Sequence, residues 1–330
     1  MCGTIIALFK FAPENAKAEQ NVFIKKQELQ LMKKPLITKK QFDILVYLTE
    51  CDGKTTQREI ASETKMSLGT VNKQMAELEA QGLVEDKKIS EKGLQVLEQF
   101  RVKRAVFIAA GFGSRLVPIT LNTPKPLVRV KGVRMIETLL DAVVAQGIEE
   151  IYIVRGYLGE QFDQLLYKYP MIKFIENPGY NEANNISSVY CAKHLLNNAY
   201  VLEADLMLYN PKLIKKYQYS SNYLGVPVEA TDDWCFYTEG DKIIKVAVGG
   251  TNCHHMFGIS YWTEEDGTKL AEDVEKVYFS PGGKERYWDM VPLEHCKQNY
   301  SLNIRECTFD DIIEIDTFNE LKSIDKTYDM

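Results

Sequence analysis

The sequence predicts an α/β protein built on a mostly parallel sheet, preceded by a small helical domain. From Val102 onward, short apolar segments with strand character alternate with helical segments at short intervals. Such alternation is typical of parallel strands joined by crossover helices and packed as a layer sandwich. Before Arg101, apolar residues recur instead at helical spacing, and cap residues divide them into short helices. Two architectures therefore follow one another along the chain.

The 330 residues divide into three predicted parts. Residues 1–35 form a lead-in segment, expected as an edge strand followed by a charged helix or a flexible stretch. Residues 36–101 form the helical domain, and residues 102–330 carry the strand and helix alternation.

Composition limits the class of protein. The fractions of hydrophobic residues, 45%, and charged residues, 26%, are ordinary for a soluble globular protein. A net charge of -6 lacks the basic footprint of most nucleic-acid binders. No apolar run approaches the ~18 residues that span a bilayer, so no membrane partner is expected. Seven cysteines without a Cys-x-x-Cys pair fit free thiols in a reducing, cytoplasmic compartment.

The helical domain has a recognisable order of elements. Capping residues and apolar spacing predict helices over 38–50, 55–64, 67–80 and 91–100, with a short wing at 87–90. This order resembles a winged helix-turn-helix of the MarR-like kind, with Ser67–Ala80 as the recognition helix. The resemblance implies DNA as a partner. The same scaffold also serves as an interaction or regulatory module.

Charge weighs against strong DNA binding by this domain. Between Leu36 and Arg101 there are 10 Lys and Arg against 11 Asp and Glu, a net charge of -1. Affinity for DNA depends largely on neutralising phosphates. The recognition helix offers four polar side chains for reading bases, namely Thr70, Asn72, Lys73 and Gln74. Both the DNA-binding and the interaction-module interpretations stay open.

In the C-terminal part, a glycine loop follows the first predicted strand. The strand Val106–Ala110 leads directly into Gly111 and Gly113, and Arg115 and Lys125 come next. Glycine tolerates positive φ, so backbone N–H groups of such a loop can converge on an anion. An arginine fork and a lysine point charge suit phosphate oxygens. The spacing matches neither the dinucleotide fingerprint nor a P-loop, so the loop predicts a different kind of phosphate site. In parallel sheets such ligands lie at the carboxyl ends of the strands.

The combination A-A-G-x-G-S-R-L, followed ten residues later by T-P-K-P-L, resembles the nucleotidyltransferase family that makes NDP-sugars and CDP-alcohols. It resembles in particular the bacterial CTP:phosphocholine cytidylyltransferases, from about Lys103 to the C-terminus. Four further stretches carry the resemblance: YIVRGYLGEQFD at 152–163, NNISSVY at 184–190, YVLEAD at 200–205, and MFGISYW with YWDM at 256–262 and 287–290. The resemblance implies a Rossmann-like three-layer sandwich. It also implies transfer of CMP from CTP to phosphocholine, with Mg²⁺ and release of pyrophosphate.

The resemblance assigns roles to individual residues. Asp205 and Asp289 are implied as the two ligands of Mg²⁺, a metal usually held by one or two carboxylates plus substrate phosphates. Lys125 and Arg115 are implied as catalytic groups that hold the phosphates and stabilise their charge. The remaining implied nucleotide-binding residues are Ala109, Ala110, Gly111, Gly113, Ser114, Gly156, Tyr157, Asn185 and Ser188. For Asn185 and Ser188, capping of a helix N-terminus is the alternative.

The acceptor region is rich in aromatic residues. A quaternary ammonium has no N–H to donate and prefers aromatic faces, so Trp234, Tyr261 and Trp288, with Asp233 nearby, are implied as choline-binding residues. Strand alternation puts Tyr261 and Trp262 on opposite faces, so one of them at most faces the pocket.

Ile186 and Ser187 stand where choline enzymes carry aromatics, so other acceptors stay open. These are 2-aminoethylphosphonate, phosphoethanolamine and a sugar-1-phosphate. A transcription regulator with a metabolite-sensing nucleotidyltransferase-like domain is the alternative from another class. The intact set of charged residues favours an enzyme. A homodimer is a possible assembly.

Overall fold

The computed structural model describes residues 37–51 and 53–329, which belong to two compact units divided between Gln99 and Phe100. The predicted lead-in, residues 1–35, lies outside the described residues. Within the described ranges, no helix is both long enough and apolar enough to cross a lipid bilayer.

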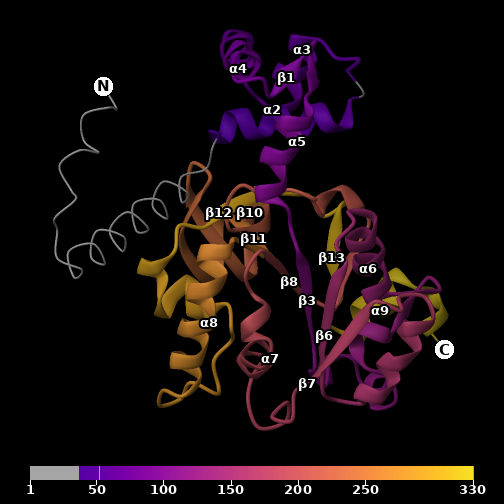
Figure 1. The fold of residues 1–330 in the computed structure, drawn as a ribbon. Coiled ribbons are helices and arrows are strands. Elements are labelled where there is room, and N and C mark those ends of the chain that lie inside the picture. The colour runs from indigo at the N-terminus through magenta and orange to yellow at the C-terminus, as the bar shows by residue number, and fades with distance from the viewer. Residues whose placement is uncertain (1–36, 52, 330) are drawn as a thin grey trace, which may run out of the picture. The chain divides into compact units, whose positions relative to one another are not determined.

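The first unit is a winged helix domain (Figure 1). Its helices begin where the sequence predicts, because Thr38, Thr56 and Ser67 each accept a backbone N–H three residues ahead. A two-stranded antiparallel hairpin forms the wing. Its elements are α2 (Lys39–Glu50), α3 (Gln57–Glu63), α4 (Leu68–Ala80), β1 (Val84–Glu85), β2 (Lys88–Ile89) and α5 (Glu91–Leu97).

The second unit is built on a mixed, mostly parallel sheet. In the described residues its strand order is β10-β12-β11-β8-β3-β6-β7, and β3 pairs in parallel with both β6 and β8. The long hairpin strands β10 and β11 pair antiparallel, and β11 also runs antiparallel to β8. The strands are β3 (Arg104–Ala109), β6 (Glu150–Arg155), β7 (Ile172–Glu176), β8 (Ala199–Glu203), β10 (Asn222–Glu239), β11 (Lys242–Trp262) and β12 (Asn303–Glu306).

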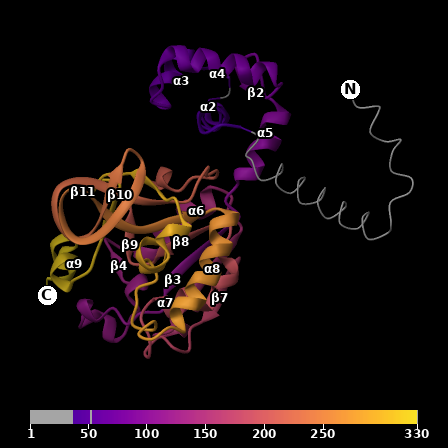
Figure 2. The ribbon, with the colours of Figure 1, turned by 90° about the vertical axis from the view of Figure 1, so that its left-hand side faces the viewer.

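Helices cover both faces of this sheet, which gives the predicted three-layer sandwich. Alternate residues of β3 divide between the layers: Ala105 and Phe107 pack with α6, and Val106 packs towards α7. On the second face α7 lies beside α8 (Figures 1 and 2). The helices are α6 (Met135–Ala145), α7 (Ile186–Cys191), α8 (Glu264–Tyr278) and α9 (Phe318–Ile324). Residues Gly159–Tyr167 form a 3₁₀ stretch.

Shorter elements complete the second unit. The strand pairs β4–β5 and β9–β13 are each antiparallel and lie outside the main sheet. These elements are β4 (Arg129–Val130), β5 (Val133–Arg134), β9 (Leu206–Leu208), β13 (Ile312–Glu314), the 3₁₀ turns at 114–116, 119–121, 125–127, 193–195, 211–213, 297–299 and 326–328, and a π-helical turn at 291–295. A further 3₁₀ turn, 98–100, includes the division between the units.

Candidate active site

A cavity of about 540 Å³ opens at the carboxyl ends of β3 and β8, where ligands of parallel sheets bind. It receives side chains from the glycine loop, the β10–β11 hairpin and the C-terminal segment. The polar, charged and aromatic residues and the glycines that line it are Gly111, Gly113, Ser114, Arg115, Lys125, Asn184, Asn185, Glu203, Asp205, Asp233, Trp234, Gly258, Tyr287, Asp289, Glu314 and Asp316. Of the phosphate-loop residues predicted from sequence, Ala109 also lines it.

Gly113 holds the loop against Lys125. Its φ of 67° lies in the left-handed region, and a Cβ there would be 2.8 Å from Cβ of Lys125. The carbonyl of Gly113 also accepts a hydrogen bond from Thr120 Oγ1 at 2.9 Å. A side chain at this position would therefore displace the buried lysine from the cavity.

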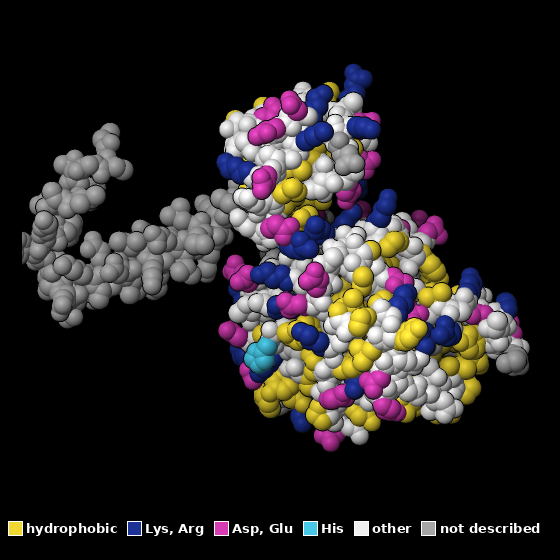
Figure 3. All heavy atoms as spheres, turned by 45° about the vertical axis from the view of Figure 1, so that its right-hand side comes forward, with side chains coloured by type: hydrophobic (Ala, Val, Ile, Leu, Met, Phe, Trp, Pro, Cys, Tyr) yellow, Lys and Arg dark blue, Asp and Glu magenta, His cyan; other side chains and the backbone are white. Residues whose placement is uncertain are grey.

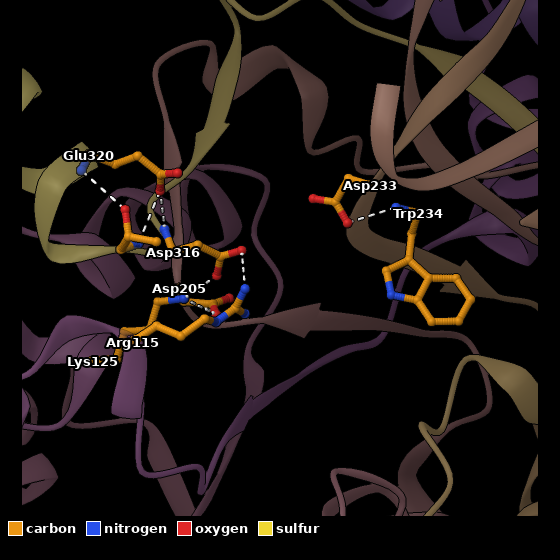
Figure 4. Close-up of polar contacts among 8 residues, drawn as sticks. Arg115, Lys125, Asp205, Asp233, Trp234, Asp316 and Glu320 are labelled. Atoms are coloured by element: carbon orange, nitrogen blue, oxygen red, sulfur yellow. Dashed lines mark hydrogen bonds and ion pairs between the residues drawn. The ribbon is translucent and has the colours of Figure 1, made fainter. Parts of the chain in front are cut away.

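Lys125 and Arg115 converge on one carboxylate, Asp316. Nζ of Lys125 lies 2.7 Å from Oδ2 of Asp205 and 2.9 Å from Oδ1 of Asp316. Nη1 of Arg115 lies 2.8 Å from Oδ2 of Asp316 (Figure 4). Both cationic side chains are therefore already bound to a carboxylate, that of Asp316. Because the Arg115 side chain is 65% exposed, it can turn towards a ligand, whereas Lys125 is buried.

Three carboxylates meet beside these cations. One oxygen each of Asp205, Glu314 and Asp316 lies within 4.8 Å of the others. The strand pair β9–β13 brings two of these carboxylates together, because Glu314 of β13 lies opposite Leu206 of β9, which follows Asp205. Residues two apart on an extended segment share a face, which brings Asp316 alongside Glu314.

The close approach of these carboxylates and Lys125 shifts the pKa values of the groups in the cluster. Burial raises the pKa of Glu314 well above its usual range, and the neighbouring carboxylates of Asp205 and Glu203 raise it further. Burial alone would raise the pKa of Asp316 too, but the charge and hydrogen bond of Lys125, a hydrogen bond with Glu314 and the charge of Arg115 together lower it. Burial would lower the pKa of Lys125, and Asp205 and Asp316 outweigh that and raise it. A further cation at the cluster would relieve the repulsion.

Asp289 and Glu203 form a second acidic pair in the cavity. Asp289 is buried and accepts a hydrogen bond from Tyr223 Oη at 2.9 Å. Burial raises the pKa of Asp289 to about 7, although the Tyr223 hydrogen bond opposes the shift. Burial also raises the pKa of Glu203, and Asp289 is its strongest charged neighbour. Asp289 lines the cavity with Asp205, but it is not one of the three carboxylates that meet, so the predicted Asp205–Asp289 ligand pair is not the grouping that the structure forms.

The hairpin side of the cavity carries the aromatic residues. Trp234 packs edge-to-face on Tyr287 with ring centroids 6.0 Å apart, and both line the cavity. Asp233 precedes Trp234 and accepts its backbone N–H at 2.6 Å. Figure 4 shows Asp233 and Trp234 on the opposite side of the view from Lys125 and Asp316.

Two predicted acceptor residues lie elsewhere. Tyr261 is 1% exposed, packs on Tyr200 and bonds Asn198 through its hydroxyl, so the prediction that it contacts the acceptor is wrong. Trp288 is fully buried against Tyr223 and does not line the cavity, so the same correction applies to it. Adjacent residues on this segment point to different sides, and it is Tyr287 that faces the cavity.

The predicted base-reading residues divide likewise. Asn185 lines the cavity and bonds Glu203 at 3.4 Å and the Trp288 backbone N–H at 2.9 Å. Ser188 is buried and accepts from Asn177 at 3.0 Å, so it is not free to read a base.

Three other predicted nucleotide-binding residues lie outside the cavity lining. The Tyr180 ring covers Gly156, where a Cβ would be 2.6 Å away from it. The Tyr157 hydroxyl donates to the Thr120 and Leu121 carbonyls, and the Ala110 carbonyl accepts from Tyr157 N at 3.0 Å.

Sequence reasoning missed Glu203, Glu314 and Asp316. Glu203 stands two residues before Asp205 in YVLEAD, where strand alternation places both on one face. The signal for the other two was the E-x-D spacing in IIEIDTF, directly after a short apolar strand. Ile186 and Ser187 are buried and do not line the cavity, so their lack of aromatic rings has no bearing on the acceptor.

An α/β sandwich with a glycine loop, paired cations and clustered acids at its strand ends defines a nucleotidyltransferase site. Comparison with known families agrees: residues 104–222 match the family model "Nucleotidyl transferase", and residues 37–85 match "Winged helix-turn-helix DNA-binding". The described recognition helix α4 lies within the second match.

Individual relatives within this family are cytidylyltransferases. The chain is 36% identical over 228 residues to a 2-aminoethylphosphonate cytidylyltransferase of Lancefieldella rimae, covering 68% of this chain and 92% of that protein. It is 31% identical to the choline-phosphate cytidylyltransferase of Streptococcus pneumoniae, covering 68% and 97%. A solved structure of the CTP:phosphocholine cytidylyltransferase from Streptococcus pneumoniae matches with a TM-score of 0.64 and 32% identity, covering 69% of this chain and 99% of that one. The chain belongs to the nucleotidyltransferase family, among the enzymes similar to CTP:phosphocholine cytidylyltransferase.

Proposed function

We propose that the protein transfers CMP from CTP to a small acceptor that carries a phosphate or phosphonate at one end and an amine at the other. The observation that carries this is the convergence of Lys125 and Arg115 on Asp316 beside three clustered carboxylates. The relatives whose names include 2-aminoethylphosphonate and choline-phosphate cytidylyltransferase support both CTP and an acceptor of this class. Phosphocholine, expected from the sequence, is one member of that class, and 2-aminoethylphosphonate is another.

The reaction is an in-line displacement. An acceptor oxygen attacks the α-phosphorus of CTP, the bond to the oxygen that bridges to the β-phosphate breaks, and pyrophosphate leaves. Because the attacking oxygen is already an anion, positioning and charge neutralisation supply the catalysis. Lys125, fixed against Gly113, would hold the α-phosphate, and Arg115 would turn from Asp316 to the β- and γ-phosphates. The loop amides around Gly111 and Gly113 would bind the outer phosphates.

The residues present fit a divalent cation. Oδ1 of Asp205 is buried and has no hydrogen-bond partner among the described residues, and it belongs to the three-carboxylate cluster. Carboxylate oxygens are ligands that Mg²⁺ prefers, with phosphate oxygens and water completing its coordination. Asp205, Glu314 and Asp316 would hold the ion, which when bound would neutralise charge on the phosphates. We therefore replace Asp289 by Glu314 and Asp316 in the proposed ligand set.

Purified protein with CTP, Mg²⁺ and an amine-bearing phosphate or phosphonate is expected to release pyrophosphate. A coupled phosphate assay with inorganic pyrophosphatase measures it, and ATP, GTP and UTP serve as controls. We expect release with CTP to exceed that with the other nucleotides at least 10-fold, a discrimination typical of hydrogen-bonded base sites. Absence of release with every amine acceptor, in protein that is folded by circular dichroism, would overturn the proposal and favour the sensor alternative.

For the winged helix unit we propose DNA binding as a second function. The family match and the exposure of Asn72 and Lys73 on α4 favour it. Of the other predicted readers, Thr70 is half-buried beside the cap residue Ser67, and Gln74 is buried and bonded to Glu77, so Gln74 does not reach bases. Acidic and basic side chains are interspersed on the face of this unit shown in Figure 3, which predicts modest affinity.

A mobility shift on the upstream region of the protein's own gene, at 50 and 200 mM salt, tests this second function. Binding is expected at low salt and should weaken by at least 10-fold at high salt. The variant Lys73→Ala should weaken it, whereas Lys40→Ala, at an exposed site on α2, serves as the control. If no shift occurs at 50 mM salt, the interaction-module interpretation remains.

A further inference from the structure

The cavity as a whole is lined by more acidic than basic side chains. Six carboxylates line the cavity, and the Lys and Arg residues that line it are Arg115 and Lys125, both paired with Asp205 or Asp316. The six acids are Glu203, Asp205, Asp233, Asp289, Glu314 and Asp316. Glu203 and Asp289 thus face the cavity without an ion-pair partner among the described residues.

The structure keeps space for the Glu203 carboxylate. Gly258 lies against it so closely that a Cβ on this residue would be 2.2 Å from Oε2 of Glu203. Asn185 donates weakly to Oε1 of Glu203, at 3.4 Å, and its own oxygen accepts the backbone N–H of Trp288, the neighbour of Asp289. Glu203 and the segment that carries Asp289 are thereby tied to one side chain at the cavity wall.

The aromatic surface at this end is small. Among the described residues the aromatic rings that line the cavity are Trp234 and Tyr287, since Tyr261, Trp262 and Trp288 are all packed in the core. Two rings at an interplanar angle of 69° do not enclose a cation on all sides. A quaternary ammonium depends on aromatic faces, whereas an ammonium with N–H bonds gains charge-assisted hydrogen bonds from carboxylates.

We propose that Glu203, with Asp289, is a specificity-determining residue that selects acceptors whose ammonium carries at least one N–H bond, in preference to quaternary ammonium acceptors. This inference rests on the proposed function and refines its acceptor class. Glu203 would accept an N–H of the ammonium through its carboxylate, which lines the cavity. Trp234 and Tyr287 would cover the apolar carbons of the acceptor. The phosphate or phosphonate end would extend across the cavity towards Lys125, which lies on the opposite side of Figure 4 from Trp234.

The test is a methylation series with the intact enzyme, CTP and Mg²⁺. The acceptors are 2-aminoethylphosphonate, phosphoethanolamine, the N-methyl and N,N-dimethyl derivatives of phosphoethanolamine, and phosphocholine. We expect kcat/KM to fall moderately along the first two methylations and at least 10-fold at the third, which removes the last N–H. Equal or better use of phosphocholine by the wild-type enzyme overturns the inference but leaves the proposed function standing. Lack of pyrophosphate with all five acceptors overturns the proposed function, and the inference falls with it.

A variant series assigns the effect to the residue. Glu203→Gln should lower kcat/KM for the primary amines 10- to 100-fold, mainly through KM, and leave the KM for CTP within about 3-fold. In this variant, the ratio of kcat/KM for a primary amine acceptor to kcat/KM for the quaternary acceptor should approach one. Glu160→Gln, at an exposed site outside the cavity lining, is the matched control and should keep the wild-type ratio. An unchanged ratio in Glu203→Gln removes this residue from the proposal, and if that variant does not fold, the wild-type series alone decides.

Discussion

Replacing Asp205 by Asn is expected to lower kcat by about 10²- to 10³-fold, the range seen when one preorganised charge-stabilising group is lost. The carboxylate of Asp205 lies 2.7 Å from Lys125 Nζ, and its other oxygen is buried without a partner beside Glu314 and Asp316. Asparagine keeps the shape and one oxygen but removes a negative charge from the proposed cation site. The fold should therefore survive while turnover is lost.

Two readouts separate this effect from unfolding. The variant should melt within a few degrees of the wild type, and the rise in melting temperature that Mg²⁺ gives the wild type should disappear. Asp163→Asn, which removes an exposed partner of Arg155, is the matched control and should behave as the wild type. Turnover within 3-fold of the wild type in Asp205→Asn would remove this residue from the proposed site.

Replacing Lys125 by Met is expected to cost both activity and stability. Activity should fall at least 10²-fold, because the charge that would stabilise the α-phosphate is gone. Stability at neutral pH should fall by about 3–5 kcal/mol, the usual cost of removing one partner of a buried ion pair. Asp205 then remains beside Glu314 without a cation, and Asp316 keeps only the exposed Arg115.

The pH dependence of this loss has a definite sign. In the wild type, Lys125 lowers the pKa of Asp316 below its usual value; in Lys125→Met that lowering is lost and burial raises the pKa instead. As the pH falls, Asp316 therefore protonates first in the variant, which removes its unbalanced charge while the wild-type pair is still ionised. The stability difference between wild type and Lys125→Met should therefore be large at pH 7.5 and shrink towards pH 4, as measured by urea unfolding. Lys168→Met, which breaks an exposed pair with Asp141, should show a small difference at both values. A loss for Lys125→Met that is the same at pH 7.5 and pH 4 would contradict the electrostatic explanation.

The sequence signals for the predicted phosphate side of the site are local. The strand before Gly111, the glycine spacing and the Pro-Lys-Pro step lie within 20 or so residues, and local pattern decides such turns. Lys125 is buried despite its charge, which the sequence alone does not indicate, since burial depends on Asp205 and Asp316 arriving from elsewhere in the chain.

Of the three clustered carboxylates, the sequence indicated Asp205 but not Glu314 or Asp316, and the reason is topological. Glu314 meets Asp205 through the register of β13 with β9, and more than a hundred residues separate those strands. A three-residue strand carries too little periodicity to reveal its partner. The pairing of Asp205 with Asp289 followed sequence motifs, whereas the fold put Asp289 beside Tyr223 and Glu203.

The aromatic residues show a related limit. Tyr287 and Trp288 are neighbours, yet one lines the cavity and the other is fully buried. Large aromatic rings serve both cores and binding sites, so composition does not decide between the two. Trp234, predicted to contact the acceptor, lines the cavity, and its role stays a prediction.

The location of the divalent cation tests the account most directly. A crystal grown with CTP and Mn²⁺, measured at a wavelength where manganese scatters anomalously, reports the ion and its ligands. The account predicts an anomalous peak within about 2.5 Å of oxygens from Asp205, Glu314 and Asp316, with Lys125 and Arg115 released onto the phosphates. An anomalous peak at Asp289 and away from Glu314 and Asp316 would contradict the account. A bound nucleotide with Asp316 still ion-paired to both Lys125 and Arg115 would also contradict it.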